Sequence, residues 1–202
     1  MVLRRGTGAS LVLFLGIGLL GISAFSLRIP AERVPAVYPE QPPVAHTGGF
    51  GEPTCHRCHF DQPLNAPGGA LTLGGIPEAY VPGERYRVTV RLARAGVRRG
   101  GFQVSARFAD GRQAGSFEPI DDRVTVVWED STAVAYAQHT LAGTRLAGAD
   151  TARWFVLWTP PDSAGADVVF HAAANAANDD DSELGDRVYA GEWVSRHTPG
   201  QE

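Results

Sequence analysis

Residues 86–108 read YRVTVRLARAGVRRGGFQVSARF, and this stretch decides the fold class. Its apolar side chains recur at every second position in two runs, at Tyr86, Val88, Val90 and Leu92 and at Phe102, Val104, Ala106 and Phe108. Polar side chains occupy most positions between them, and Arg99, Gly100 and Gly101 precede the second run. A period of two is typical of strands with one buried face, and glycine is typical of reversals. We therefore expect two strands, with a turn at residues 99–101.

The same alternation continues through residues 71–196. A first strand begins at Leu71, and further strands are expected at Arg123–Trp128, Ala133–His139, Arg153–Trp158, Asp167–Ala173 and Val188–Ser195, about eight in all. Turn residues such as Asp110-Gly111 separate the strands, and no amphipathic helical pattern of useful length occurs between them. The sequence therefore predicts an all-β domain over residues 71–196, an antiparallel sandwich of two packed sheets.

The composition fits one globular domain with short appendages. The chain has 202 residues, of which 44% are hydrophobic and 20% are charged. It is too apolar for a disordered chain and too polar for a protein with many membrane spans. Its formal net charge is -4. Because phosphate neutralisation needs a basic surface, we expect no nucleic-acid partner.

Residues 1–27 have the features of a membrane-targeting segment. Arg4 and Arg5 precede an uncharged stretch over residues 7–27, which is long enough to span a bilayer as a helix. The positive-inside rule keeps the arginines in the cytoplasm and exports the rest to the periplasmic side of the inner membrane. A cleavable signal peptide is the alternative, because small residues lie at Ser23, Ala24 and Ser26. We favour an uncleaved signal anchor, since the apolar stretch is longer than in most signal peptides.

Residues 28–45 read as a proline-rich linker. Prolines recur among polar residues there, a composition that disfavours helix and sheet. We expect an extended tether that holds the domain away from the membrane. The segment between this linker and the sandwich, residues 46–70, contains the motif that carries the chemistry.

That motif is Cys55-His56-Arg57-Cys58-His59, which has the Cys-x-x-Cys-His spacing of a c-type haem attachment site. Residues three apart on one helical turn face the same side, so the thiols of Cys55 and Cys58 can form thioethers with the two vinyl groups of one porphyrin. His59 can then bind the iron as the proximal ligand. The motif uses both cysteines of the chain and lies on the side expected to be exported. The sequence therefore predicts one covalently attached haem c.

Two alternatives remain for the cysteine pair. A disulfide between Cys55 and Cys58 would be structural or redox-active, but a thioredoxin-like pair belongs beside a βαβ unit, and the pattern predicts none. A zinc site would need four ligands in two separated pairs, and the histidines of the motif lie too close to the cysteines to complete a tetrahedron. Haem attachment is the favoured interpretation.

The ligand on the other face of the iron is left open by the sequence. The only methionine is Met1, so a His/Met pair within this chain is excluded. The candidate distal ligands are His46, His139 and His171, and the alternative is an open site or a foreign ligand. Since methionine ligation raises the reduction potential, a bis-histidine iron is expected to have a comparatively low one.

Several short segments resemble, in order, the landmarks of a Reeler-type β-sandwich. They are Tyr80–Tyr86, Gly101–Gln103, Gly115–Phe117, His139-Thr140, Trp158–Pro161 and Asn175–Asn178. The chain is similar in particular to bacterial exported members in which a Thr-Gly-x-x-Gly-Glu segment, here Thr47–Glu52, and Cys-x-x-Cys-His precede the sandwich. The resemblance implies an immunoglobulin-like sandwich with a haem-attachment segment docked to it.

The resemblance also bears on two of the candidate distal ligands. His171 stands where an aromatic residue is more usual in this family, which favours a local role for it. His139 matches a position that is also histidine in relatives without the haem motif, which favours a structural role.

An oxygen-rich loop follows the strand expected at Asp167–Ala173. Hard cations such as calcium prefer such ligands, but the spacing of an EF-hand is absent. A solvated acidic turn is the favoured interpretation, and a calcium site is the alternative. The residues concerned are Asn175, Asn178, Asp179, Asp180, Asp181, Glu183 and Asp186.

Together these features predict an exported, membrane-tethered monohaem c-type cytochrome that transfers electrons without converting a substrate. Its partner would be a redox protein in or near the membrane, and the acidic exported part favours a partner with a basic face. One alternative is a cell-surface binding or adhesion module without haem. Another is a haem enzyme or gas sensor with an open sixth position. We do not favour an enzyme, because no catalytic triad, phosphate loop or carboxylate pair can be argued from the spacing.

Overall fold

The computed structural model describes residues 41–162 and 165–197. The segment expected at residues 1–27 and most of the linker expected at 28–45 lie outside the described residues. Within the described ranges, no helix is long and apolar enough to cross a membrane.

The regular structure of the described residues consists of ten strands and two single-turn 3-10 helices. The strands are β1 (Gly69–Gly74), β2 (Ala79–Tyr80), β3 (Tyr86–Arg94), β4 (Arg99–Phe108), β5 (Ser116–Pro119), β6 (Val124–Glu129), β7 (Val134–His139), β8 (Thr151–Thr159), β9 (Val168–Ala177) and β10 (Arg187–His197). The helices are η1 (Cys55–Arg57) and η2 (Ala142–Thr144). The strands expected from the sequence are all present. The additional strands β2 and β5 have only two and four residues, too few for an alternating pattern to identify them.

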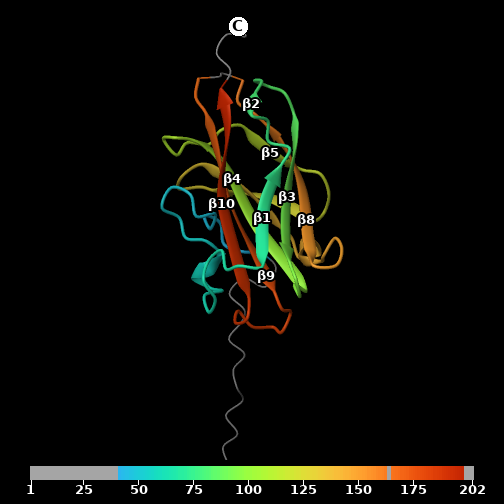
Figure 1. The fold of residues 1–202 in the computed structure, drawn as a ribbon. Helices are drawn as coiled ribbons and strands as arrows, with labels where there is room; N and C mark the ends of the chain where they lie inside the picture. The colour runs from blue at the N-terminus through green and yellow to red at the C-terminus, as the bar shows by residue number, and fades with distance from the viewer. Residues whose placement is uncertain (1–40, 163–164, 198–202) are drawn as a thin grey trace, which may run out of the picture. The chain divides into compact units, whose positions relative to one another are not determined.

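The strands form two packed sheets (Figure 1). The four-stranded sheet has the order β1-β3-β8-β5, and the six-stranded sheet has the order β2-β10-β9-β4-β7-β6. The predicted two-sheet, all-β sandwich is confirmed. The expectation of purely antiparallel pairing is wrong at one edge, where Ala79 and Tyr80 of β2 run parallel to Arg196 and His197 of β10. The chain enters β2 from the other sheet, so a crossover rather than a hairpin sets the direction of this strand.

The turn expected at residues 99–101 lies earlier in the chain. Gly96 has a φ of 79° at the reversal, and Gly100 and Gly101 already pair with β9. Gly100 faces the core, where a Cβ would lie 2.6 Å from the Cβ of Ala152. This glycine therefore reflects close packing between the sheets rather than a reversal.

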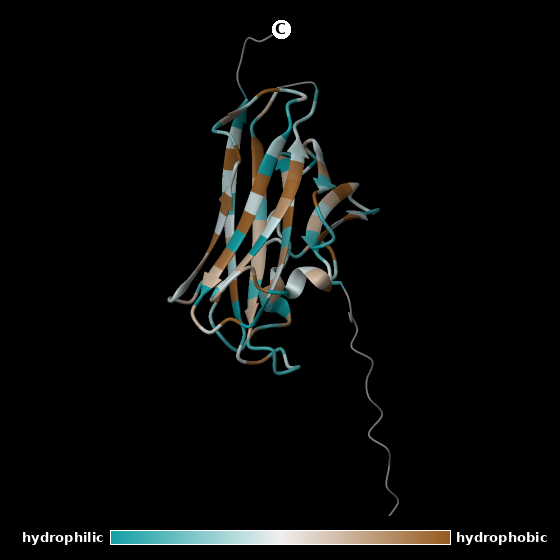
Figure 2. Ribbon diagram, turned by 90° about the vertical axis from the view of Figure 1, so that its right-hand side faces the viewer, coloured by the Kyte–Doolittle hydropathy of each residue, from teal (hydrophilic) through white to brown (hydrophobic). Residues whose placement is uncertain are grey.

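The core lies between the sheets and is built from the apolar alternate positions. The ring of Phe102 in β4 packs 4.6 Å from that of Trp154 in β8, and Trp158 meets Phe170 edge-on at 4.7 Å. All four side chains are at most 1% exposed. Burying one large apolar side chain contributes about 1.5 to 3 kcal/mol. Figure 2 shows the resulting alternation of hydrophobic and hydrophilic residues along the strands.

Residues 41–65, which we call the covering segment, lie against the outward side chains of the six-stranded sheet. Gln103 Nε2 donates to the Pro43 carbonyl at 3.0 Å, and Gln138 Nε2 donates to the Pro42 carbonyl at 3.3 Å. At the other end of the segment, the Asn65 amide donates to a carbonyl of β10 at 2.9 Å. The polar outward side chains of β4 are consequently buried. These side chains are Gln103, Ser105 and Arg107.

Candidate functional site

The Cys-x-x-Cys-His motif forms the turn η1 and the two residues after it. The Thr54 hydroxyl caps this turn by accepting a hydrogen bond from the His56 amide at 3.1 Å. The amides of Cys58 and His59 then donate to the Cys55 carbonyl at 3.2 and 3.1 Å. The expected single helical turn is confirmed as a 3-10 turn, and the side chains of its two cysteines and of His59 line one cavity.

A buried ion pair holds the loop before this turn to the sheet. Glu52 Oε1 accepts hydrogen bonds from Arg107 of β4 and from the Tyr136 hydroxyl of β7. Glu52 Oε2 accepts from the Thr47 hydroxyl at 2.7 Å, which closes the loop on itself. The side chains of Arg107 and Glu52 are 5% and 11% exposed. Burial and the carboxylate of Glu52 hold the pKa of Tyr136 well above its usual range, so its hydroxyl remains a donor.

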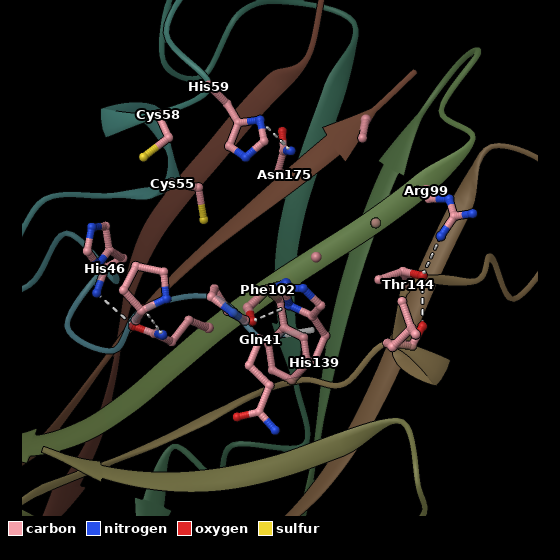
Figure 3. Close-up of a pocket in the computed structure, with 17 residues that line it drawn as sticks. Gln41, His46, Cys55, Cys58, His59, Arg99, Phe102, His139, Thr144 and Asn175 are labelled. Atoms are coloured by element: carbon pink, nitrogen blue, oxygen red, sulfur yellow. Dashed lines mark hydrogen bonds between the residues drawn. The ribbon is translucent and has the colours of Figure 1, made fainter. Parts of the chain in front are cut away.

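A buried carboxylate orients His59. Its Nδ1 lies 2.7 Å from Oδ2 of Asp186, whose side chain is 1% exposed. Asp186 also accepts hydrogen bonds from the Asn175 side chain at 2.8 Å and from the Asn178 amide at 3.1 Å. Because an ionised carboxylate only accepts, Nδ1 carries the proton. Nδ1 also lies 3.1 Å from Asn175 Nδ2, whereas Nε2 points toward the cavity (Figure 3). A metal-ligating histidine is held in this way, with its second nitrogen donating to a carboxylate.

The cavity beside the turn has a volume of about 330 Å³. Figure 3 shows Cys55, Cys58 and His59 along one edge of it and His139 with Phe102 across from them. Sites for small molecules typically have volumes of about 300 to 1,000 Å³. Burial raises the pKa of the Cys55 thiol to about 12, so this group is protonated at neutral pH. The structure thus brings the three motif residues to one cavity of suitable size for a ligand.

Two of the candidate distal histidines line the same cavity. His139, the last residue of β7, has its Nδ1 3.0 Å from the Phe102 amide. Burial lowers the pKa of His139, the hydrogen bond with the Phe102 backbone opposes this shift, and the nearby His59 adds to it. His46 reaches the cavity from the covering segment, with Nδ1 2.8 Å from the Val44 carbonyl.

The third candidate, His171, lies apart from the cavity. Its Nε2 is 2.9 Å from Oε2 of Glu192, and its ring meets Phe50 edge-on with the centroids 5.2 Å apart. In the strand register, His171 is opposite Ser105, two residues beyond Gln103 and away from the motif. Its neighbours are therefore the loop at Phe50 and the strand β10.

The oxygen-rich residues expected in one loop divide into two groups. Asn175 belongs to β9, which runs to Ala177 instead of ending near Ala173 as expected, and Asn175 and Asp186 both lie beside His59. Asn178 and Asp180 instead bind each other, with Asn178 Nδ2 2.9 Å from Asp180 Oδ2, and Asp179 pairs with Arg99. Among the described residues, no group of three or more His, Cys, Asp or Glu side chains is arranged to hold a metal ion.

Several residues that shape the site were not found by sequence reasoning. The sequence places Asp186 only within an oxygen-rich loop, and it assigns no role to the alternate polar residues Gln103 and Arg107. The acidic residue Glu52 in the Thr47–Glu52 segment is the one sequence feature that could have indicated a cationic partner. Its partner Arg107 lies 55 positions away, so no local pattern could identify it.

Comparison with known proteins adds likenesses of fold. No protein-family model matches the chain, and no curated protein matches it. Among solved structures it is similar to the reeler domain of human F-spondin, with 20% identity and a TM-score of 0.43 over 69% of this chain and 98% of that one. It is also similar to a cohesin module from Clostridium perfringens, with 10% identity and a TM-score of 0.42 over 64% and 96% of the two chains. The two-sheet sandwich itself is established by the order of the strands in the two sheets.

Proposed function

We propose that the chain is an exported monohaem c-type cytochrome, tethered at the periplasmic side of the inner membrane by residues 1–27. Cys55 and Cys58 attach the porphyrin through thioethers, and His59 binds the iron. One observation carries the proposal: the buried Asp186 holds His59 through Nδ1, so that Nε2 is presented to the cavity that both cysteines line. An imidazole with this support is oriented to bind iron.

The described residues fit a covalently attached porphyrin. Both cysteines are free, and their spacing on one turn matches the spacing that two thioethers require. Gly100 and Gly101 line the cavity without side chains of their own. When bound, the haem supplies a one-electron redox couple whose potential depends on its ligands and on burial.

Asp186 acts on the site through His59. Donation from Nδ1 to a carboxylate makes Nε2 a more basic ligand, and a more basic ligand favours the oxidised iron. The residues of this chain therefore favour a comparatively low reduction potential.

The partner we propose is a redox protein with a basic docking face. The loop between β9 and β10 presents exposed acidic side chains, and the same loop leads into Asp186 beside the site. The exposed residues are Asp179, Asp180, Asp181 and Glu183. Charges of opposite sign steer association, and salt weakens this steering. The rate of electron transfer to a basic redox protein is expected to fall as ionic strength rises.

Expression of the full chain in a host with haem c maturation tests the proposal. Intact mass spectrometry should show one haem per chain, and a pyridine haemochrome spectrum should show two thioether bonds. Cys55→Ala and Cys58→Ala should each leave one thioether or abolish attachment. Gly74→Ala is a matched control, because a Cβ there meets nothing within 4 Å.

A colourless product from this competent host would overturn the proposal. If that product had also lost two hydrogens to a disulfide between Cys55 and Cys58, a haem-free binding module would be favoured instead. The single-cysteine variants distinguish these outcomes, because neither can form the intramolecular disulfide.

A further inference from the structure

We infer that His139 is the second axial ligand, with its Nε2 bound to the haem iron opposite His59. The inference rests on the proposed function and adds to it, because it assigns a residue to the sixth position and makes the iron six-coordinate. Four features of the fold support this assignment. They are the position of His139 on β7, the hydrogen bonds of its ring, the glycine beneath the ring, and the positions of the other two candidate histidines.

The strand register places the two imidazoles on either side of one strand. Gly101 of β4 is the register partner of Asn175 in β9, which contacts His59. On the other side of β4, Gln103 pairs with Gln138 of β7, so His139 lies beside Phe102 at the next position. The strand β4 thus separates the His59 cluster from His139, and both histidines line the cavity above it.

The hydrogen bonding of His139 leaves one nitrogen available. Nδ1 is 3.0 Å from the Phe102 amide and 3.1 Å from the Phe102 carbonyl. Among the described residues, the hydrogen bonds of the His139 ring all involve Nδ1 and none involves Nε2. Nε2 of a neutral imidazole is a good metal ligand when Nδ1 carries the proton. In that tautomer Nδ1 donates to the Phe102 carbonyl at 3.1 Å instead of accepting from the Phe102 amide, so the Phe102 carbonyl orients His139 as Asp186 orients His59.

Gly101 provides the space that the His139 ring occupies. A Cβ at residue 101 would lie 2.7 Å from Cε1 of His139 and 3.1 Å from both ring nitrogens. The φ of Gly101 lies outside the left-handed region, so backbone freedom does not explain why glycine occupies this position. Because Gly101 has no side chain, the imidazole of His139 packs directly on the backbone of β4. Gly101 then contributes only backbone atoms to the part of β4 between His59 and His139.

The other histidines are less suited to the sixth position. His171 is paired with Glu192 outside the cavity. His46 lines the cavity, but it belongs to the covering segment rather than to a strand, and its own backbone amide is bound by Gln103 at 2.7 Å. A ring fixed on a buried strand loses less rotational freedom on binding iron than one on a loop. His46 is therefore the rival that an experiment must exclude.

The haem-loaded full chain tests the inference by its spin state. The wild-type protein should give low-spin absorption and electron paramagnetic resonance spectra and should not bind carbon monoxide readily. His139→Ala should become high-spin and bind carbon monoxide, and added imidazole should restore the low-spin spectrum. A merely structural role of His139 would not give this rescue.

A second variant keeps the test independent of folding of the His139 variant. Gly101→Ala should displace the ring and raise the high-spin fraction, whereas the control Gly74→Ala should not. His46→Ala and His171→Ala should both remain low-spin. A high-spin wild-type protein, or loss of the low-spin spectrum in the His46 variant alone, would overturn the inference while leaving haem attachment intact. A chain without covalent haem would instead overturn the proposed function and the inference with it.

Discussion

The strands β3 and β4 share one alternating pattern but lie in different surroundings. In β3 the polar side chains remain accessible to solvent, since Arg87 is exposed and Arg91 is half-buried. In β4 the corresponding positions Gln103 and Arg107 are buried, because the covering segment packs on them. Alternation therefore predicts which face of a strand enters the core, and it leaves the fate of the other face open.

The two buried faces of β4 are stabilised by different forces. The inner face packs apolar rings and methyl groups against the second sheet. The outer face binds the covering segment through Glu52, Arg107 and the glutamine pair. A buried ion pair gains electrostatic attraction but loses the hydration of both charges, so it adds little net stability. Its main effect is to hold the covering segment in one position on the sheet. The site depends on this outer face, since the motif follows Glu52 directly.

The largest effect is expected on the inner faces, where β3 and β4 should respond alike. Leu92→Ala in β3 should lower the free energy of unfolding by about 2 to 5 kcal/mol and Phe102→Ala in β4 by about 3 to 5 kcal/mol, because each leaves a cavity in the core. Urea denaturation of the full chain measures this loss. A negligible loss in either variant would mean that its side chain does not contribute to the shared core.

On the outer faces, the matched substitutions should differ. Arg107→Met should lower the free energy of unfolding by about 3 kcal/mol, because it leaves the Glu52 carboxylate buried without its cation. Arg91→Met in β3 should have little effect, since surface charges contribute about 0 to 1 kcal/mol. Amide hydrogen exchange should show loosening of residues 47–62 in the Arg107 variant.

A double variant separates the ion pair from simple packing. Glu52→Gln with Arg107→Met should recover part of the stability lost by Arg107→Met alone, because no unpaired charge then remains buried. If the double variant were less stable than the sum of the two single losses, the charge argument would fail.

Asp186→Asn should have a smaller effect on stability and a specific effect on the site. Replacing the acceptor of three hydrogen bonds should cost about 1 to 3 kcal/mol. In the haem-loaded protein, the reduction potential should rise, because His59 becomes a less basic ligand. Redox titration measures the potential, and Asp180→Asn in the same loop is the control that should leave it unchanged.

Alkaline pH should produce the smallest effect, and it should act through Tyr136. The pKa of Tyr136 is raised in the fold by burial and by Glu52, whereas an unfolded chain ionises tyrosine near pH 10. The contribution of Tyr136 to the free energy of unfolding is therefore fully present below about pH 10. It falls as the pH rises above that value, because the unfolded chain then releases the tyrosine proton while the folded protein keeps it. Tyr136→Phe should weaken the fall of stability with rising pH. Denaturation experiments between about pH 9 and pH 11 test this, because that range brackets the ionisation of tyrosine in the unfolded chain.

Much of the fold could be predicted from the sequence because strand periodicity is a local signal. The runs at Tyr86 and Phe102 identify β3 and β4 and their inner faces. The turn at residues 99–101 was misplaced, because Gly100 serves packing between sheets and a single sequence does not distinguish that use of glycine from a reversal. The parallel pairing of β2 depends on a crossover between sheets, which no local pattern encodes.

The candidate site also contains some relations that the sequence predicts and others that it does not. The spacing of Cys55, Cys58 and His59 on one turn could be predicted, since residues three apart on a turn face the same side. The Asp186 contact to His59 could not, because it requires strands β9 and β10 to pair in one register. The same holds for His139, which the sequence ranks beside His46 and His171 and which the fold places across the cavity from His59.

The sequence alone therefore determined which side chains of β3 and β4 enter the core and that Cys55, Cys58 and His59 lie together on one turn, because spacing within one strand or one turn fixes those relations. Tertiary structure alone decided which carboxylate supports His59, which histidines line the cavity and which polar face is buried. Those relations join residues far apart in the chain, and they exist only once the register of the sheet and the position of the covering segment are set.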